Sequence, residues 1–390
     1  MTQFQFKLNY EEMERTILES NMSGVIKSSI ILMLNEYMEY ERDKYMQNEA
    51  YERNEDRKTY RNGYYERDYM ISLGKITLKV PRTRNSEFST TVFERYQRMD
   101  QALILSMMEM VINGVSTRKI TKVIEQLAGE TVSASFVSSL TKRLDPLIKE
   151  WANRNLSNVN PSYLYVDAMY IKVRENGRVI SKAVYIAEAL KENGYYEIVG
   201  FEVEAVESFT AWQRFLQSLK NRGLKQPKLI ISDAHEGLKK AIKEVFTGAT
   251  WQRCTVHLKR NIFDRLPKKN SGAFKRKIID IFNQTSEEIA REKWEELIDQ
   301  YHELPAFTKA LEILEYAFDD AVQFMHEQEV RHKYIKSTNH LERLNQEIRR
   351  RERVIRIFPN HDSSFRLIGA VLMDLQENPP TRKRKVPMND

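Results

Sequence analysis

A change of hydrophobic periodicity near the middle of the chain most limits the folds open to this sequence. Over residues 101–151 the apolar side chains recur at helical spacing, and after the turn cluster at residues 158–161 they alternate as they do in strands. Three strand-like segments then follow in succession, at residues 163–173, 179–190 and 196–204. Strands that follow one another so closely predict an antiparallel meander.

The segments after the meander alternate between helix and strand. They are a helical stretch at residues 209–223, the continuous apolar strand KLIIS, Asp233, a helix from about Glu236 to Val245, and a short strand with the sequence TWQRC. Three antiparallel strands followed by helix, buried strand, helix and strand is the order of a ribonuclease-H-like α/β fold. Residues 258–336 carry only helical patterns and predict an all-helical insertion in that fold.

The length of the chain, 390 residues, indicates more than one domain, because single hydrophobic cores stop growing near ~250–300 residues. The expected parts are an N-terminal helical and hairpin region at 1–100, a helix-turn-helix DNA-binding domain at 101–157, a ribonuclease-H-like catalytic domain at 158–257 and 337–375, the helical insertion at 258–336, and a basic tail at 376–390.

The first of these parts combines a helix with a hairpin. A helix is predicted from about residue 9 to 55, and residues 71–80 alternate like strands bent at Gly74. Between them, tyrosines and arginines surround Asn62-Gly63, which we interpret as a turn. Tyrosine beside arginine suits a nucleic-acid backbone, although tyrosines that pack a small hairpin explain the pattern equally well.

Residues 101–151 predict three helices interrupted at Asn113-Gly114 and at Gly129. Ser116 can cap the second helix, and Ser133 or Ser135 the third. Two short helices joined through a glycine turn fit a helix-turn-helix whose second helix enters the major groove of DNA. Helical hairpins of this kind are also common in proteins that bind no DNA, so both interpretations stay open.

Charge and cysteine content favour a polyanion partner and a reducing compartment. Lys and Arg number 62 against 55 for Asp and Glu, and the basic residues crowd residues 343–356 and 382–385. The alternative for both clusters is a solvated face or a disordered end. One cysteine allows no disulfide within the chain, and no segment approaches the ~20 apolar residues that cross a bilayer. We expect a soluble cytoplasmic protein that does not engage membranes.

Two carboxylates lie where the predicted sheet would place an active site. Asp167 interrupts a strand face that is otherwise apolar, and strand interiors are depleted in Asp. Asp233 ends the buried strand, and ligands of open α/β sheets gather at the carboxyl ends of strands. Asp233 could instead cap the helix that follows it.

A third carboxylate, Glu342, begins a helix that is otherwise rich in arginine. Leu341, Leu344 and Ile348 form its packing stripe, so Glu342 lies on the adjacent polar face. Two aspartates and a glutamate supply the hard oxygen ligands that Mg²⁺ prefers, and two such ions can support an in-line phosphoryl displacement. The simpler alternative is that Glu342 completes a capping box begun by Asn339.

Several motifs resemble those of a known family. They are DAMYIKV around Asp167, LIISDAHEGL around Asp233, WQRCTVHLKRNI from Trp251, STNHLERLNQEIRRR around Glu342, and in the N-terminal part YRNGYYERDY and GVSTRKI. Together they resemble the mutator-type transposases of bacterial insertion sequences, relatives of the plant Mutator elements. The likeness covers almost the whole chain.

The resemblance implies a DDE transposase with a ribonuclease-H-like fold and a helical insertion before the glutamate. Asp167, Asp233 and Glu342 match the metal-binding triad of that family, which implies Mg²⁺, with Mn²⁺ as a substitute. The N-terminal region would bind the terminal inverted repeats of the element, and the partners would be double-stranded DNA and further copies in a homodimer or higher multimer. The protein would act at the bacterial nucleoid.

Further positions are assigned by motif or by charge. Cys254 and His257 match a Cys-x-x-His signature of the family, but two ligands do not make a tetrahedral zinc site. Trp294 resembles a tryptophan that related transposases stack on DNA, although its helical spacing suits a core residue equally. The residues expected to contact DNA are Arg118, Ser138, Lys142, Arg143, His257, Arg343, Asn345, Arg349 and Arg350.

Two other functions remain open at this point. The chain could be a DNA-binding protein of transposon descent that has lost catalysis, or a structure-specific nuclease of the same fold. The intact carboxylate triad argues against the first of these alternatives.

Overall fold

The computed structural model describes residues 22–47, 58–93, 99–379 and 385–388. The chain divides into two compact units, residues 1–141 and 142–390. The division lies earlier than the turn near residue 158 that the sequence suggested. The reason is α6 (Asp145–Ala152), which folds with the second unit. Arg366 donates two hydrogen bonds to the Asp145 carboxylate, at 2.5 and 2.9 Å, and Gly369 makes room for the buried Ile148.

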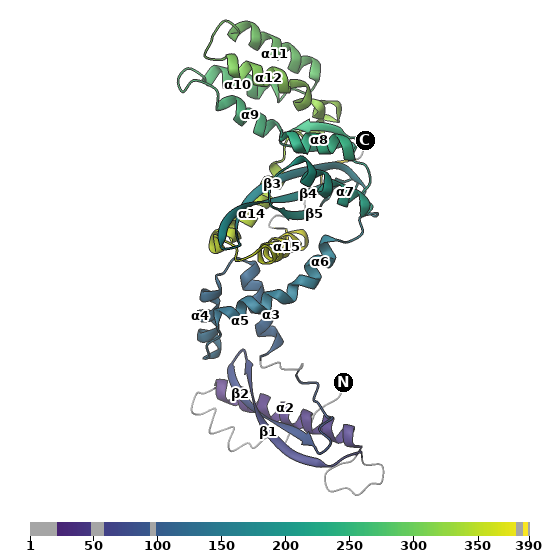
Figure 1. The fold of residues 1–390 in the computed structure, drawn as a ribbon, viewed down its shortest axis with the longest axis vertical. Coiled ribbons are helices and arrows are strands. Elements are labelled where there is room, and N and C mark those ends of the chain that lie inside the picture. The colour runs from purple at the N-terminus through teal and green to yellow at the C-terminus, as the bar shows by residue number, and fades with distance from the viewer. Residues whose placement is uncertain (1–21, 48–57, 94–98, 380–384, 389–390) are drawn as a thin grey trace. The chain divides into compact units, whose positions relative to one another are not determined.

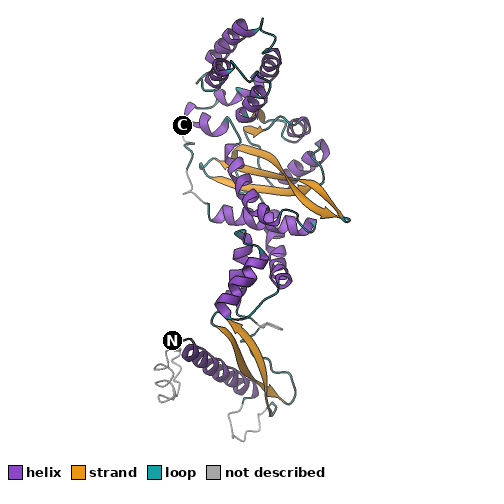
Figure 2. Cartoon of the chain, turned by 90° about the vertical axis from the view of Figure 1, so that its left-hand side faces the viewer, coloured by secondary structure: helices purple, strands orange, loops and turns teal. Residues whose placement is uncertain are grey.

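The first unit begins with a helix packed on a hairpin. Helix α2 (Met22–Met46) lies along the antiparallel strands β1 (Arg61–Ile71) and β2 (Gly74–Thr83), as Figures 1 and 2 show. Their shared core consists of Met38, Tyr69, Ile71, Ile76, Leu78, Val80 and Phe93. The predicted helix is therefore present where the structure describes it, and residues 9–21 and 48–55 of that prediction lie outside the described residues.

The turn predicted at Asn62-Gly63 is wrong. The pairing register shifts between Arg61 and Tyr64, so these residues form an irregularity inside β1, and Gly63 supplies the positive φ of +66°. The strands are joined instead between Ile71 and Gly74, which pair across the turn. An Asn-Gly pair fits a bulge as well as it fits a hairpin, and the strand alternation after Gly74 was the better guide.

The three helices expected in residues 101–151 are α3 (Gln101–Ile112), α4 (Thr117–Ala128) and α5 (Ala134–Thr141). Ser116 caps α4 as predicted, because its side chain accepts a hydrogen bond from the Lys119 backbone N–H at 3.3 Å. Ser133, and not Ser135, accepts from the backbone at the start of α5. The third helix is shorter than predicted: Lys142 and Arg143 lie in a separate 3₁₀ turn, η1 (Lys142–Leu144).

The second unit is built on a five-stranded sheet with the order β5-β4-β3-β6-β7. Its strands are β3 (Pro161–Glu175), β4 (Arg178–Lys191), β5 (Tyr196–Glu204), β6 (Leu229–Ser232) and β7 (Thr250–Arg253). The first three are antiparallel neighbours, and β6 and β7 run parallel to β3. The predicted meander and the strands after it are confirmed, and the unit is mixed α/β.

Helices cover both faces of this sheet (Figure 2). On one face α7 (Phe209–Asn221) and α8 (Glu236–Val245) pack on a cluster of buried apolar residues that includes Leu164, Val166 and Trp212. On the other face lie α14 (Asn339–Ile355) and α15 (His361–Glu377), both of which contact β3.

Residues 255–335 contain helices and no strand. They form α9 (Thr255–Phe263), α10 (Gly272–Ile281), α11 (Glu287–Tyr301), α12 (Thr308–Ala321), η2 (Gln323–His326) and α13 (Glu329–Ile335). Figure 1 shows α9 to α12 as one helical group beside α8. The described end of the basic tail is docked, because Val386 is buried and donates its backbone N–H to the Gly194 carbonyl at 2.9 Å. None of the described helices is long and apolar enough to cross a membrane.

Candidate active site

Asp167 occupies the middle of β3 on the face turned toward α14. It is 7% exposed, and the Asn345 amide donates a 2.8 Å hydrogen bond to its Oδ2. Burial, and then the charge of Asp233, raise the pKa of Asp167 to about 7, while His257 and Asn345 act in the opposite direction. The buried Asp167 carboxylate thus lies near a second negative charge, and its neighbours compensate it only in part.

Asp233 follows β6 directly, at the carboxyl end of the parallel strands. Its Oδ1 accepts a 3.3 Å hydrogen bond from the His235 backbone N–H. The N-cap of α8 is His235, whose Nδ1 accepts from the Leu238 N–H, so the alternative that Asp233 caps this helix is wrong. Asp233 therefore does not cap α8, and it lies close enough to Asp167 for its charge to act on that residue.

Glu342 lies in the first turn of α14. The helix has Thr338 at its N-cap without any side-chain capping bond, so the capping box considered from the sequence does not form. Glu342 Oε1 instead lies 3.4 Å from His257 Nε2. Asn345, one turn further along the same helix, reaches Asp167, and so α14 is tied to the site at two successive turns.

His257, in the first turn of α9, sits among the three carboxylates. The adjacent Cys254 sulfur raises the pKa of His257 to about 9, an effect that burial opposes and that Asp167 and Asp233 reinforce. Its Nδ1 is buried and makes no hydrogen bond of standard geometry, so we attribute the influence of Cys254 to proximity and charge. A protonated His257 supplies the positive charge that the carboxylates lack.

Cys254 is a buried thiol that links α9 to the start of α14. The backbone N–H and the hydroxyl of Thr338 both donate to its sulfur, at 3.4 Å. Burial alone would raise the pKa of the Cys254 thiol, yet His257 and Thr338 together hold it below its usual value. In the Cys-x-x-His motif, Cys254 therefore connects the starts of α9 and α14, and this connection also positions the His257 imidazole.

The carboxylates form a donor set that suits a hard divalent cation, although they are not arranged around a shared ion. Among the described residues, no three His, Cys, Asp or Glu side chains are placed to hold a metal. At this site Glu342 Oε1 contacts His257 Nε2. The buried Asp167, whose pKa is raised by desolvation and by the nearby charge of Asp233, is the observation that fits a cation, because a positive ion would stabilise both carboxylates.

The arginine run of α14 is only partly available to a ligand. Arg351 is buried, with Glu347 at 2.6 Å and Asp374 at 3.6 Å, so it joins α14 to α15. Arg350 also pairs with Glu347, at 3.1 Å, yet its side chain stays 57% exposed, and Arg349 stays 45% exposed beside Glu352. The other predicted DNA contacts Arg118, Ser138, Lys142, Arg143 and Arg343 are exposed.

Trp294 belongs to the helices before α14. Its ring stacks on Phe318 with centroids 4.8 Å apart, and the Arg291 guanidinium lies over both rings. The indole Nε1 is buried without a hydrogen-bond partner. This arrangement is that of a half-buried packing residue, and its DNA-stacking role stays a prediction.

The sequence reasoning missed a second polar cluster on the same sheet face. Glu188 of β4 is 3% exposed, and its Oε2 lies 2.6 Å from His340 Nδ1. The His340 ring stacks on Tyr196, with centroids 3.8 Å apart and planes 5° from parallel. One signal was available, because Glu188 is an acid within an apolar strand, as Asp167 is. Its partner lies 152 residues later, beyond the reach of any local pattern.

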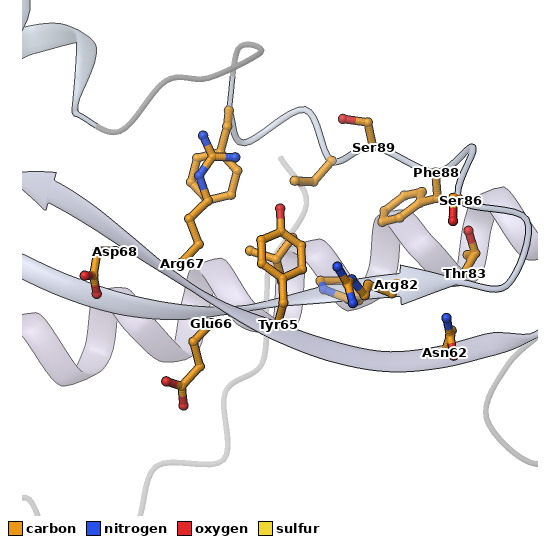
Figure 3. Close-up of a pocket in the computed structure, with 14 residues that line it drawn as sticks. Asn62, Tyr65, Glu66, Arg67, Asp68, Arg82, Thr83, Ser86, Phe88 and Ser89 are labelled. Atoms are coloured by element: carbon orange, nitrogen blue, oxygen red, sulfur yellow. The ribbon is translucent and has the colours of Figure 1, made fainter.

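The hairpin of the first unit carries an open groove of about 850 Å³. Tyr65 and Arg67 project into it from β1 and Arg82 from β2, while Glu66 points the opposite way (Figure 3). The guanidinium of Arg82 lies over the Tyr65 ring at 5.0 Å, and that of Arg67 lies over Phe93 at 4.2 Å. The tyrosines and arginines noted in the sequence thus contribute to one surface on which arginines lie over aromatic rings.

Comparison with known proteins shows which family the chain resembles. Residues 1–380 match the family described as "Transposase, Mutator family". The chain is 50% identical over 377 residues to the transposase for insertion sequence element IS256 in transposon Tn4001 of Staphylococcus aureus, covering 97% of this chain and 96% of the relative. It is 39% identical to the transposase for insertion sequence element ISRM5 of Rhizobium meliloti, covering 96% and 94%. Among solved structures, the Mos1 strand transfer complex is similar at 12% identity and a TM-score of 0.17, over 42% of this chain and 60% of that one.

Proposed function

The chain belongs to the Mutator family of transposases, and from that premise we propose that it binds the terminal inverted repeats of an insertion sequence and cleaves and joins DNA through a DDE two-metal mechanism. Transposases of this class act on DNA by strand cleavage and transfer. The observation that supports the mechanism is the proximity of Asp167 and Asp233, together with the contacts by which α14, which bears Glu342, reaches this site.

The proposed metal ligands are Asp167, Asp233 and Glu342, and the proposed metal is Mg²⁺, with Mn²⁺ as a substitute. When bound, such ions activate the attacking oxygen and stabilise the leaving oxygen of an in-line phosphoryl transfer. The present contact between Glu342 and His257 must then be exchanged for one with the cation.

The remaining residues of the site position these ligands. Asn345 donates a hydrogen bond to Oδ2 of Asp167 and so fixes the orientation of this carboxylate. His257 holds Glu342 near the aspartates, and Cys254 with Thr338 fixes the start of α14 relative to α9. The chain's own contribution is therefore to keep three carboxylates from distant segments within reach of one another.

DNA recognition is assigned to the first unit and to the exposed arginines of α14. Helices α4 and α5 serve as a helix-turn-helix, with Arg118 and Ser138 as exposed contacts, and the Tyr65, Arg67 and Arg82 groove holds backbone phosphates. Pairing of two element ends implies a homodimer or a larger multimer.

A labelled inverted-repeat duplex incubated with Mg²⁺ and target DNA tests this function. Wild-type protein should nick the end and join it to the target, while Asp233→Asn and Glu342→Gln should bind the end without either reaction. Binding without chemistry by the wild type would indicate a DNA-binding protein that has lost catalysis. Indiscriminate cutting of branched or hybrid substrates would indicate a structure-specific nuclease.

A further inference from the structure

A buried arginine without a partner lies beside the site. Arg253, the last residue of β7, is 7% exposed, and its Nε is sealed from solvent and makes no hydrogen bond. In the part of the chain that the structure describes, no carboxylate oxygen lies within 4.0 Å of its guanidinium nitrogens, the distance that defines an ion pair. Burying a guanidinium without a counter-charge is costly, so a folded protein that retains one has a use for it.

The acidic groups around Arg253 attract it without touching it. Burial lowers the pKa of Arg253, and the charges of Asp320, Tyr316, Asp233 and Glu236 oppose this shift from a distance. Asp320 is already engaged by Lys239, at 2.5 Å. Asp233 is one of the proposed metal ligands. In the described part of the chain, none of these four groups forms a hydrogen bond or an ion pair with the guanidinium.

A second buried arginine shows how this fold satisfies such a side chain when its role is structural. Arg222 is also held in a desolvated place, and burial lowers its pKa to about 10. Its two terminal nitrogens donate to the carbonyls of Ala152 and Val199, at 2.5 and 2.7 Å. Arg253 has no equivalent bonds among the residues described.

The position of Arg253 places it at the edge of the proposed phosphoryl-transfer centre. It pairs in register with Ser232, the residue before Asp233, so both lie at the carboxyl ends of parallel strands. The next residue, Cys254, donates its backbone N–H to Ser232 and begins the motif that carries His257. The planar fork of a guanidinium matches phosphate oxygens and binds them in bidentate fashion.

We propose that the Arg253 guanidinium binds a backbone phosphate of the DNA strand next to the reacting phosphodiester. The proposal rests on the proposed function, because it places this phosphate in the same active site. Neutralisation by DNA would supply the partner that the protein lacks, so Arg253 would act both in binding and in aligning the strand.

The test uses the full-length protein carrying Asp233→Asn, which prevents turnover, together with Arg253→Gln, Arg253→Lys or the matched control Arg222→Gln. Binding to an inverted-repeat duplex is measured by fluorescence anisotropy over a range of KCl, and thermal unfolding is recorded for each variant. The salt slope is the slope of the logarithm of the binding constant against the logarithm of the KCl concentration. Loss of one phosphate contact should make this slope less steep by about 0.9 in Arg253→Gln. Arg253→Lys should retain most of that slope, and Arg253→Gln should unfold at no lower temperature than its parent.

The control should behave in the opposite way. Arg222→Gln should unfold at a lower temperature and keep the parental salt slope. If Arg253→Gln instead lost stability as Arg222→Gln does, with an unchanged salt slope, the arginine would be structural and the proposal wrong.

Duplexes with a single methylphosphonate locate the contact. One position near the cleavage site should weaken binding by the parent about tenfold and leave Arg253→Gln unaffected, since the charge-assisted bond is worth about 1.4 kcal/mol. Equal weakening of both proteins at every position would overturn the proposal. These binding readouts are independent of catalysis, so a wild-type protein that fails to join DNA would refute the proposed function without deciding this contact.

Discussion

The two faces of the central sheet are formed by the same strands but have different roles: one packs the core, and the other carries the candidate site. Toward α7 and α8 the strands present a mainly apolar surface, where the Tyr185 ring stacks on Trp212 with centroids 3.8 Å apart. Toward α14 the neighbouring residues of β3 and β4 carry polar groups, including Asp167 and Glu188. Alternation along a strand thus separates the stability of the fold from the chemistry of the site.

The polar face is defined by long-range partners. The Tyr165 hydroxyl donates to the Tyr334 carbonyl at 3.2 Å, Asn345 donates to Asp167, and His340 contacts Glu188. Each of these contacts joins the sheet to residues 334–345. These contacts make the polar face depend on the position of residues 334–345.

The largest expected effect is on the polar face. Asp167→Asn should lower strand transfer by at least about a thousandfold, or about 4 kcal/mol, because it removes a proposed metal ligand. The fold should tolerate the change, since Asn has the same shape and relieves the repulsion with Asp233. Joining assays with saturating DNA and thermal unfolding of the same preparation measure both effects. Near-normal joining would exclude Asp167 from the catalytic site.

The apolar face should give the converse result. Trp212→Ala removes a fully buried side chain and should reduce the free energy of unfolding by about 3–5 kcal/mol. Gln217→Ala, at an exposed position of the same helix, is the control and should change it by no more than about 0.5 kcal/mol. Urea unfolding measures both. A Trp212→Ala protein of normal stability that cannot join DNA would remove the distinction between the faces.

The cluster of Glu188 and His340 should show an intermediate effect. His340→Ala leaves a buried carboxylate unpaired and should destabilise the protein by about 1–3 kcal/mol. Combining it with Glu188→Leu should restore most of that loss, because neither partner is then left charged in the interior. A double-mutant cycle followed by urea unfolding provides the measurement, and additive losses would show that the two side chains are not coupled.

Local patterns predicted most of the elements of this fold. The meander, the buried strand before Asp233 and the Ser116 cap all follow from periodicity and capping chemistry, which act over a few residues. The turn at Asn62-Gly63 failed because the same dipeptide serves a bulge, and the choice depends on how β1 pairs with β2. The domain boundary lies earlier than predicted because Arg366, 221 residues further along the chain, pairs with Asp145 and holds α6 in the second unit.

The candidate site was less accessible to sequence reasoning. Asp167 stood out as an acid in a strand, Asp233 as the end of a buried strand and Glu342 as an acid in an arginine-rich helix, and the motif resemblance implied the same three residues. Neither approach could indicate that His257 faces Glu342 or that Arg253 lacks a partner, since both depend on side-chain packing between distant segments. Asn345 was expected to contact DNA, and the structure gives it Asp167 as a partner.

That last difference leads to the smallest expected effect. Asn345→Ala removes one charge-assisted hydrogen bond to Asp167 and should slow joining at saturating DNA by about tenfold, or about 1.4 kcal/mol, with unchanged affinity for the element end. Arg350→Ala, on the exposed part of the same helix, is the matched contrast and should weaken binding with little effect at saturation. If Asn345→Ala weakened binding and joined normally at saturation, Asn345 would be a DNA contact and Asp167 would be positioned without it. The polar face would then depend on α14 through the contact between His340 and Glu188, and the aspartates would be positioned by the sheet itself.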